Sequence, residues 1–216
     1  MKPLPDADPA RWGRQLDQGL QALELDLDTS SRQRLLAYLA LLHKWNRAYN
    51  LTAVRDPDEM VSRHLLDSLS ILPWVRGPRV LDVGTGAGLP GIPLAIACPD
   101  SDFVLLDSNG KKTRFVQHAV IDLGLDNVAV VQERVERLVD PDGFHTITSR
   151  AFADLHQMLR LTQHLHAPGG CWAAMKAGLE ELQREPLPPG LAAEVIPLRV
   201  PGITGRRHLV RVCEAS

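Results

Sequence analysis

The sequence predicts an α/β fold, with a mostly parallel sheet that carries an antiparallel C-terminal strand and is preceded by N-terminal helices. From residue 79 onward, short apolar runs alternate with segments of helical periodicity, which is the pattern of βαβ units and a parallel sheet covered by helices. Residues 1–72 show helical signals without strand-like runs. The chain closes with two strand-like runs around a turn rich in proline and glycine, which predicts a hairpin and therefore an antiparallel strand.

Three helices are expected before the sheet. The first spans about residues 10–23, and the second begins near Thr29, where apolar side chains recur at helical spacing. The third starts at Asp56-Pro57, an N-cap acid followed by proline at the first helical position, and ends near residue 72. We expect residues 1–72 to form a helical extension packed on a core of residues 73–216, in one globular unit.

The remaining elements follow from alternating periodicity. The expected strands are 80–83, 103–106, 127–132, 146–149, 171–175, 194–200 and 207–212. The expected helices are about 90–98, 110–124, 133–139 and 154–166.

Composition indicates an ordinary soluble, cytoplasmic protein. The net charge of -2 argues against binding nucleic acid through the overall field of the protein, although local basic patches remain compatible with it. The amino terminus lacks an apolar signal segment, and no apolar run is long enough to span a membrane. Cys98, Cys171 and Cys213 form no C-x-x-C pair, so we expect three buried thiols and neither a disulfide nor a zinc site.

A glycine-rich turn at residues 80–91 is the most informative segment for function. Four strand-type residues run into Gly84, Gly86 and Gly88, and a helical stretch follows, which places bare backbone where a ligand must approach closely. A dinucleotide fingerprint would need its third glycine where this chain has Leu89. A frame that begins at Gly86 fits the spacing, but it starts two residues late and contains a proline.

Two acids accompany this turn. Asp82 lies within the strand before it, and an acid followed by G-x-G-x-G is typical of S-adenosyl-L-methionine (SAM) methyltransferases. Asp107 ends the next apolar run, where a carboxylate can accept both ribose hydroxyls of a nucleoside. Asp107 supports either SAM or NAD, and a surface turn with a capping acid is the non-functional alternative. A parallel sheet with an antiparallel last strand is the Rossmann-like methyltransferase variant, so the tail agrees with SAM.

The residues after the fourth expected strand reduce the number of possible methyl-acceptor atoms. Thr148-Ser-Arg-Ala-Phe152 lacks the Asn/Asp-Pro-Pro-Tyr sequence of amine methylation, and it lacks the cysteine that methylation of pyrimidine C5 needs. No acid cluster suggests a metal-dependent reaction. The acceptors that remain have a lone pair and no proton to remove, and guanine N7 is one of several. Such a reaction depends chiefly on positioning.

Several motifs spread over roughly residues 35–213 occur together. They are Asn46-x-x-x-Asn50-Leu-Thr52, Arg63-His-Leu-Leu-Asp-Ser68, the 81–93 block, Leu105-Leu-Asp-Ser108, Ser149-Arg-Ala-Phe152, Pro168-Gly-Gly170 and Arg207-His-Leu-Val210. In this combination the chain resembles the RsmG (glucose-inhibited division protein B) family of bacterial 16S rRNA guanine-N7 methyltransferases. The resemblance implies SAM as cofactor and the small ribosomal subunit as partner. It further implies methylation of guanosine 527, in the 530 loop of 16S rRNA.

The resemblance also assigns site residues. The cofactor set that motif and resemblance give is Asp82, Gly84, Gly86, Gly88, Leu89, Asp107, Val135, Glu136 and Arg150. Arg150 is expected to position the acceptor base, with His64 and Lys176 as further catalytic candidates. The RNA-binding candidates are Asn46, Lys111, Arg206, Arg207 and His208. Each has a purely structural alternative, such as an ion pair for Arg150 or loop capping for Asn46.

Two other functions stay open on the sequence alone. A SAM-binding protein without catalysis, acting as a ribosome-assembly or regulatory factor, would carry the same motifs. An NAD-dependent oxidoreductase is disfavoured by the glycine register and Asp82. We expect no metal and no membrane partner, and a monomer.

Overall fold

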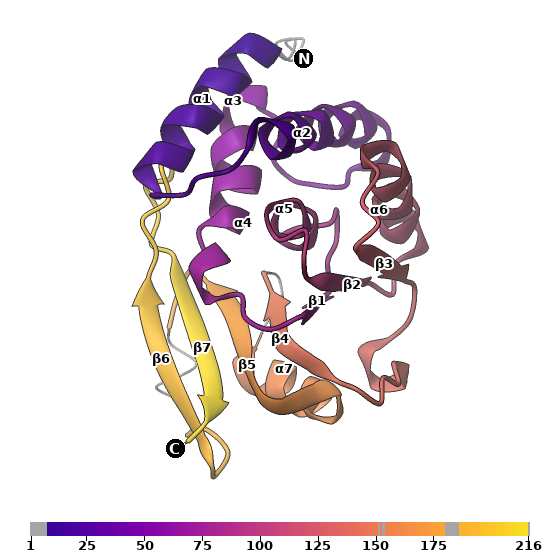
Figure 1. Cartoon of the computed structure of the whole chain (residues 1–216), viewed down its shortest axis with the longest axis vertical. Coiled ribbons are helices and arrows are strands. Elements are labelled where there is room, and N and C mark those ends of the chain that lie inside the picture. Colours follow the sequence, from indigo (N-terminus) through magenta and orange to yellow (C-terminus); the bar gives the residue numbers. More distant parts are fainter. Residues whose placement is uncertain (1–7, 151, 153, 180–185, 216) are drawn as a thin grey trace.

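The computed structural model describes residues 8–150, 152, 154–179 and 186–215. Its centre is a seven-stranded sheet in the order β3-β2-β1-β4-β5-β7-β6 (Figure 1). The strands are β1 (Arg79–Val83), β2 (Asp102–Leu106), β3 (Val128–Val131), β4 (Phe144–Ser149), β5 (His166–Lys176), β6 (Leu191–Pro197) and β7 (His208–Glu214).

The sheet confirms the predicted fold class. The strands from β1 to β5 pair in parallel, whereas β7 runs antiparallel to both β5 and β6. Strand order reverses at β1, which has β2 on one side and β4 on the other. The carboxyl ends of β1 and β4 therefore flank the crevice in which open α/β sheets bind ligands.

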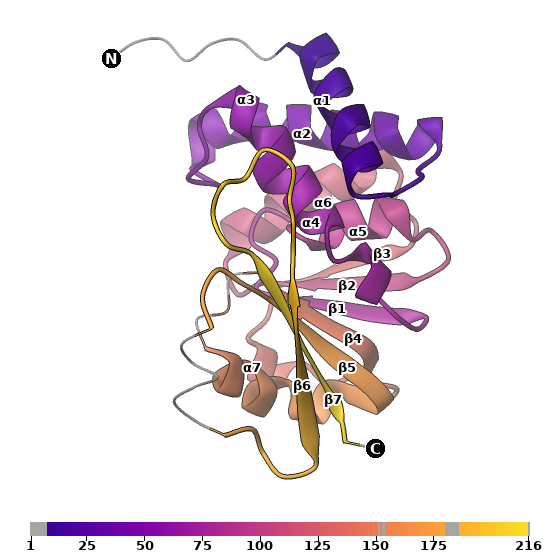
Figure 2. The ribbon, with the colours of Figure 1, turned by 90° about the vertical axis from the view of Figure 1, so that its left-hand side faces the viewer.

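Helices cover both faces of the sheet. The helical elements are α1 (Pro9–Ala22), α2 (Thr29–Tyr49), α3 (Pro57–Met60), a π-helical segment (Val61–Leu66), α4 (Asp67–Leu69), α5 (Gly91–Ala97), α6 (Gly110–Leu123) and α7 (Leu155–Thr162). Short 3-10 turns occupy Leu72–Trp74, Val135–Arg137 and Gln163–Leu165. Figure 2 shows α1 to α6 on one side of the sheet and α7 on the other. Among the described helices, none is both long and apolar enough to cross a membrane.

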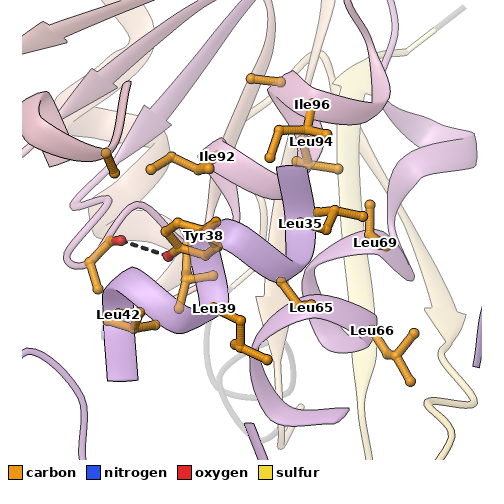
Figure 3. Close-up of a cluster of buried hydrophobic side chains, with 14 of the residues drawn as sticks. Leu35, Tyr38, Leu39, Leu42, Leu65, Leu66, Leu69, Ile92, Leu94 and Ile96 are labelled. Carbon is orange, nitrogen blue, oxygen red and sulfur yellow. Dashed lines mark hydrogen bonds between the residues drawn. The ribbon is translucent and has the colours of Figure 1, made fainter. Parts of the chain in front are cut away.

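The N-terminal helices share a core with the glycine turn. Leucines of α2 interdigitate with leucines around α4 and with isoleucines of α5 (Figure 3). Within this cluster the buried Tyr38 hydroxyl donates to the carbonyl of Ala87, 2.7 Å away. The Trp12 indole of α1 donates to the carbonyl of Pro57 at 2.9 Å. The helical region thus braces the turn that follows β1.

Two local predictions are wrong. The helix expected over residues 133–139 is a single 3-10 turn, Val135–Arg137, after which Leu138 is already extended. Asp140 pairs with Arg79 at the start of β1, so the residues after β3 must run back along the sheet, and extended chain covers that distance in fewer residues than a helix.

The cysteines were also predicted wrongly. Cys171 and Cys213 form a disulfide, with their Cα atoms 4.5 Å apart, and Cys98 is free. The antiparallel register of β5 and β7 places Cys171 directly opposite Cys213. Spacing along the chain does not contain this information, because the pair depends on which strands become neighbours.

Candidate functional site

The turn after β1 needs glycine for its backbone conformation. Gly84, Gly86 and Gly88 have φ values of +68°, +62° and +89°, a region that side chains of L-residues disfavour. An added Cβ at Gly84 would meet nothing within 4 Å. The backbone amides of Gly84 and Thr85 both donate to the carbonyl of Leu106, at 2.8 and 3.0 Å, which fixes the turn against the end of β2.

Asp82 organises this turn from inside the protein. Its Oδ2 accepts hydrogen bonds from the Thr85 hydroxyl at 2.6 Å and from the Gly91 amide at 2.9 Å. A side chain at residue 91 would collide with Leu105. Burial raises the pKa of Asp82 to about 6, against the opposing effect of these two hydrogen bonds.

Asp107 lies at the end of β2 beside the same turn. Its Oδ2 accepts from the Gly86 amide at 2.9 Å and its Oδ1 from the Asn109 amide at 2.8 Å, while the Lys112 ammonium is 3.8 Å from Oδ2. Each carboxylate oxygen has two lone pairs. Both oxygens can therefore accept further hydrogen bonds, as two ribose hydroxyls would require.

A cavity of about 170 Å³ opens at the carboxyl ends of β1, β2 and β3; we call it the cofactor cavity. It is lined by Val83, Gly84, Leu106, Asp107, Ser108, Glu133, Arg134, Val135, Glu136, Phe152 and Leu161. It brings together four members of the predicted cofactor set, Gly84, Asp107, Val135 and Glu136. Bare backbone, a carboxylate and apolar side chains together fit a nucleoside cofactor.

The remaining members of the predicted cofactor set lie behind or beside this cavity. Asp82 and the side chain of Leu89 are buried, and Leu89 packs in the core shared with α2 and α5. Gly86 and Gly88 shape the turn but do not line the cavity. Arg150 lines a second cavity.

The second cavity, of about 280 Å³, is rich in cationic side chains; we call it the arginine cavity. It is lined by Thr52, Val54, Arg63, His64, Asp67, Arg150, Met175, Lys176, Ala177, Leu198, Arg207 and His208. It therefore unites the three catalytic candidates with two of the RNA-binding candidates, Arg207 and His208. These residues come from the π-helical segment and from the ends of β4, β5 and β7.

The segment after β4 contributes a residue to each cavity. Arg150 lines the arginine cavity, and Phe152 lines the cofactor cavity. The Lys176 ammonium, at the end of β5, donates to the carbonyl of Phe152 at 3.1 Å. Ala151 lies outside the described residues.

Arg150 is held by the π-helical segment and by the first residue of α4. Its Nη1 donates to the carbonyl of Arg63 at 3.0 Å and lies 3.5 Å from Oδ2 of Asp67. Arg207 approaches the other oxygen of Asp67, with 3.2 Å between Nε and Oδ1. Burial raises the pKa of the Asp67 carboxyl, while Arg150 and Arg207 act in the opposite direction. Asp67 was missed by sequence reasoning, although it stands in a motif that carried the resemblance.

His64 is uncharged at neutral pH in this environment. The residue is 2% exposed, and its Nε2 is 3.2 Å from the Thr52 hydroxyl. Burial, with a contribution from the Arg150 charge, lowers the pKa of His64 to about 3. A histidine with this pKa is a poor proton acceptor at neutral pH.

The other RNA-binding candidates do not line the arginine cavity. Asn46 is buried; its amide donates to the carbonyl of Val54 at 3.2 Å, and its Oδ1 accepts from the Thr52 amide at 2.9 Å. Its side chain thus shapes the loop that contributes Thr52 to the cavity. Lys111 and Arg206 are exposed and line neither cavity.

Among the described residues, no group of three or more His, Cys, Asp or Glu side chains is placed to hold a metal ion.

Comparisons with known proteins point to one family. The family model described as rRNA small subunit methyltransferase G matches residues 31–210. A protein of Chromohalobacter salexigens named ribosomal RNA small subunit methyltransferase G is 55% identical over 201 residues, covering 93% of this chain and 96% of its own. A protein of the same name from Marinobacter nauticus is 52% identical, covering 95% of this chain and 97% of its own.

Solved structures agree on the fold. The O-methyltransferase TomG from Streptomyces achromogenes, in complex with SAM, is similar with a TM-score of 0.60 at 18% identity, covering 98% of this chain and 100% of its own. A SAM-dependent methyltransferase from Aquifex aeolicus is similar with a TM-score of 0.56 at 19% identity, covering 77% of this chain and 97% of its own.

Proposed function

This chain belongs to the rRNA small subunit methyltransferase G family, and from that premise we propose that it methylates N7 of one guanine in the 530 loop of 16S rRNA. Its activity is methyl transfer to RNA of the small ribosomal subunit, and its methyl donor is SAM. The observation that supports this proposal is the pairing of two cavities, one suited to a nucleoside cofactor and one rich in cations, at the segment that follows β4.

The cofactor cavity suits SAM by its donor set. Asp107 would accept the ribose hydroxyls, and Val135 and Glu136 would contact the adenine. Gly84 leaves the backbone open beside the methionine part. When bound, SAM supplies a methyl group on a positively charged sulfur, which is an electrophile that needs no further activation by the protein.

The arginine cavity is suited to an acceptor with no proton to lose. His64 has a pKa of about 3, and Asp67 has a guanidinium beside each of its oxygens. Neither is suited to act as a general base. Guanine N7 attacks through its own lone pair, so the site has only to hold it in line with the methyl group and sulfur.

Arg150 is the residue that would hold the base. Arginine is the common partner of guanine, because its planar donors match O6 and N7. For N7 to be the nucleophile its lone pair must stay free, so we propose that the guanidinium donates to O6. Arg207 and His208, which line the same cavity, would contact the flanking RNA.

Methyl transfer with labelled SAM tests this function. The purified protein is incubated with methyl-tritiated SAM and small subunits or 16S rRNA from cells that lack the gene. The label is then located by strand cleavage at N7-methylguanine. We expect a single labelled guanine in the 530 loop and at least a tenfold loss of rate in Arg150→Ala, which is the usual scale when a positioning group is removed.

Arg34→Ala is the matched control, because Arg34 is an exposed arginine on α2 that lines neither cavity. It should methylate at the wild-type rate. Label at another atom or another nucleotide would refute the N7 proposal while leaving rRNA methylation intact. If SAM and rRNA bind but no label is transferred, the protein is instead a noncatalytic assembly or regulatory factor.

A further inference from the structure

Asp67 is a buried carboxylate that connects three distant segments of the chain. It follows the π-helical segment, and its side chain is 6% exposed. Its Oδ2 faces Arg150 at the end of β4, 83 residues further along the chain, at 3.5 Å. Its Oδ1 accepts from Nε of Arg207, beside β7, at 3.2 Å. One carboxylate thus contacts two of the cations that line the arginine cavity.

The π-helical segment adds a second contact to the same arrangement. The backbone amide of Asp67 donates to the carbonyl of Ser62, five residues earlier, whereas an α-helix would direct it to Arg63. The Arg63 carbonyl instead accepts from Nη1 of Arg150 at 3.0 Å. Single π-helical turns of this kind occur frequently at functional sites. The wider turn therefore offers Arg150 a carbonyl as well as a carboxylate.

Both arginines remain available to a ligand. Their side chains are 24% and 25% exposed, and a guanidinium has five N–H donors. The contacts with Asp67 and Arg63 occupy only part of each fork. Arg207 also donates from Nη1 to the carbonyl of Arg206 at 2.9 Å. These contacts fix the orientation of both arginines and leave part of each fork free at the cavity that both line.

We propose that Asp67 is a positioning residue, which holds Arg150 and Arg207 in the orientation in which they bind the RNA around the target base. This inference rests on the proposed function, because it assigns the arginine cavity to the RNA acceptor. Both carboxylate oxygens of Asp67 face guanidinium groups, so Asp67 acts through the two arginines. Its effect is to remove the freedom of two long side chains before RNA arrives, which lowers the entropic penalty of binding.

The first test is Asp67→Asn, which keeps the shape of the side chain and removes its charge. Steady-state methylation of small subunits is measured together with the dissociation constants for SAM and for an RNA fragment of the target loop. We expect the KM for RNA to rise roughly tenfold, on the scale of couplings within one salt-bridge network. SAM affinity should stay unchanged, because Asp67 does not line the cofactor cavity.

Asp140→Asn is the matched control. It removes the carboxylate that contacts Arg79 with two bonds of 2.7 Å, at the opposite end of β1 from the cavities. Losing an ion pair of this kind lowers thermal stability in both variants. A merely structural Asp67 would therefore behave like Asp140, with a lower melting temperature and an unchanged KM for RNA, and that result would overturn the proposal.

A double-mutant cycle with Arg207→Gln tests the connection directly. In the wild-type background we expect this substitution to lower kcat/KM about tenfold, and in the Asp67→Asn background by less than about threefold, because Arg207 is already misplaced there. Equal factors in the two backgrounds would refute positioning through Asp67.

Arg207→Lys leaves the buried carboxylate of Asp67 intact. This variant therefore provides a test even if Asp67→Asn does not fold. Lysine keeps the positive charge but cannot reproduce the planar fork. We expect the KM for RNA to rise roughly tenfold. A wild-type KM would show that positive charge alone is sufficient at this position, and would overturn the proposal that an oriented guanidinium is needed. A wild-type protein that binds the RNA fragment but methylates nothing would refute the proposed function, whereas the RNA dissociation constants of the variants would still decide the role of Asp67.

Discussion

Substitution of Gly84 by alanine should separate cofactor binding from folding. Gly84 has a φ of +68° and lines the cofactor cavity, and an added Cβ would meet no atom of the protein within 4 Å. The stability change therefore comes from backbone strain alone, about 1–2 kcal/mol for an L-residue in the left-handed region. In a chain of this size that strain lowers the melting temperature by roughly 2–8 °C.

The same substitution should also weaken SAM binding, for a reason separate from the backbone strain. The new methyl group projects into open space beside the cavity, where the cofactor must approach the backbone. Forcing an extra methyl group into a packed site costs about 1–3 kcal/mol, which corresponds to a SAM dissociation constant raised roughly 5- to 150-fold. Calorimetric titration with SAM measures the dissociation constant, and thermal unfolding measures the strain.

Gly124→Ala provides the matched control. Gly124 ends α6 with a φ of +59°, and an added Cβ there would also meet nothing within 4 Å. It is exposed and lines neither cavity. The two variants should lose similar stability, and only Gly84→Ala should lose SAM affinity. Dissociation constants within about twofold of each other would refute the placement of the cofactor against this turn.

Three further predictions concern the support of the turn and its core. Because burial raises the pKa of Asp82 to about 6, the folded state favours the protonated acid; the free energy of unfolding should fall by about 2 kcal/mol as pH rises from about 4 to 7. Urea unfolding at several pH values should show this fall in the wild type and not in Asp82→Asn, and parallel pH profiles would contradict it. Tyr38→Phe removes the buried hydrogen bond to Ala87, so urea unfolding should show a loss of about 1–3 kcal/mol; an unchanged midpoint would show that the bond is dispensable. Gly19→Ala would drive a Cβ into the buried Leu66 side chain, and thermal unfolding should report a loss of about 1–3 kcal/mol unless α1 shifts freely.

The elements and their order could be predicted from the sequence because their signals are local. Short apolar runs that alternate with helical segments predict the parallel strands, and the hairpin signal near the end of the chain predicts the antiparallel strand. The glycine turn is equally local, since positive φ at Gly84, Gly86 and Gly88 is a property of each residue's own backbone. The predicted helix over residues 133–139 is wrong for the opposite reason. Asp140 must reach Arg79 at the start of β1, and this distant contact leaves only one 3-10 turn, Val135–Arg137, before the chain becomes extended.

Contacts between distant segments were decided only by the tertiary structure. The disulfide between Cys171 and Cys213 follows from the pairing of β5 with β7, and Asp67 meets Arg150 and Arg207 because α4, β4 and β7 converge on one cavity. Periodicity shows which face of an element is apolar. It does not show which polar side chains of different elements will contact one another in the folded chain. A buried carboxylate needs cations or hydrogen-bond donors around it, so the partners of Asp67, and with them its role, are determined by the packing of the whole chain.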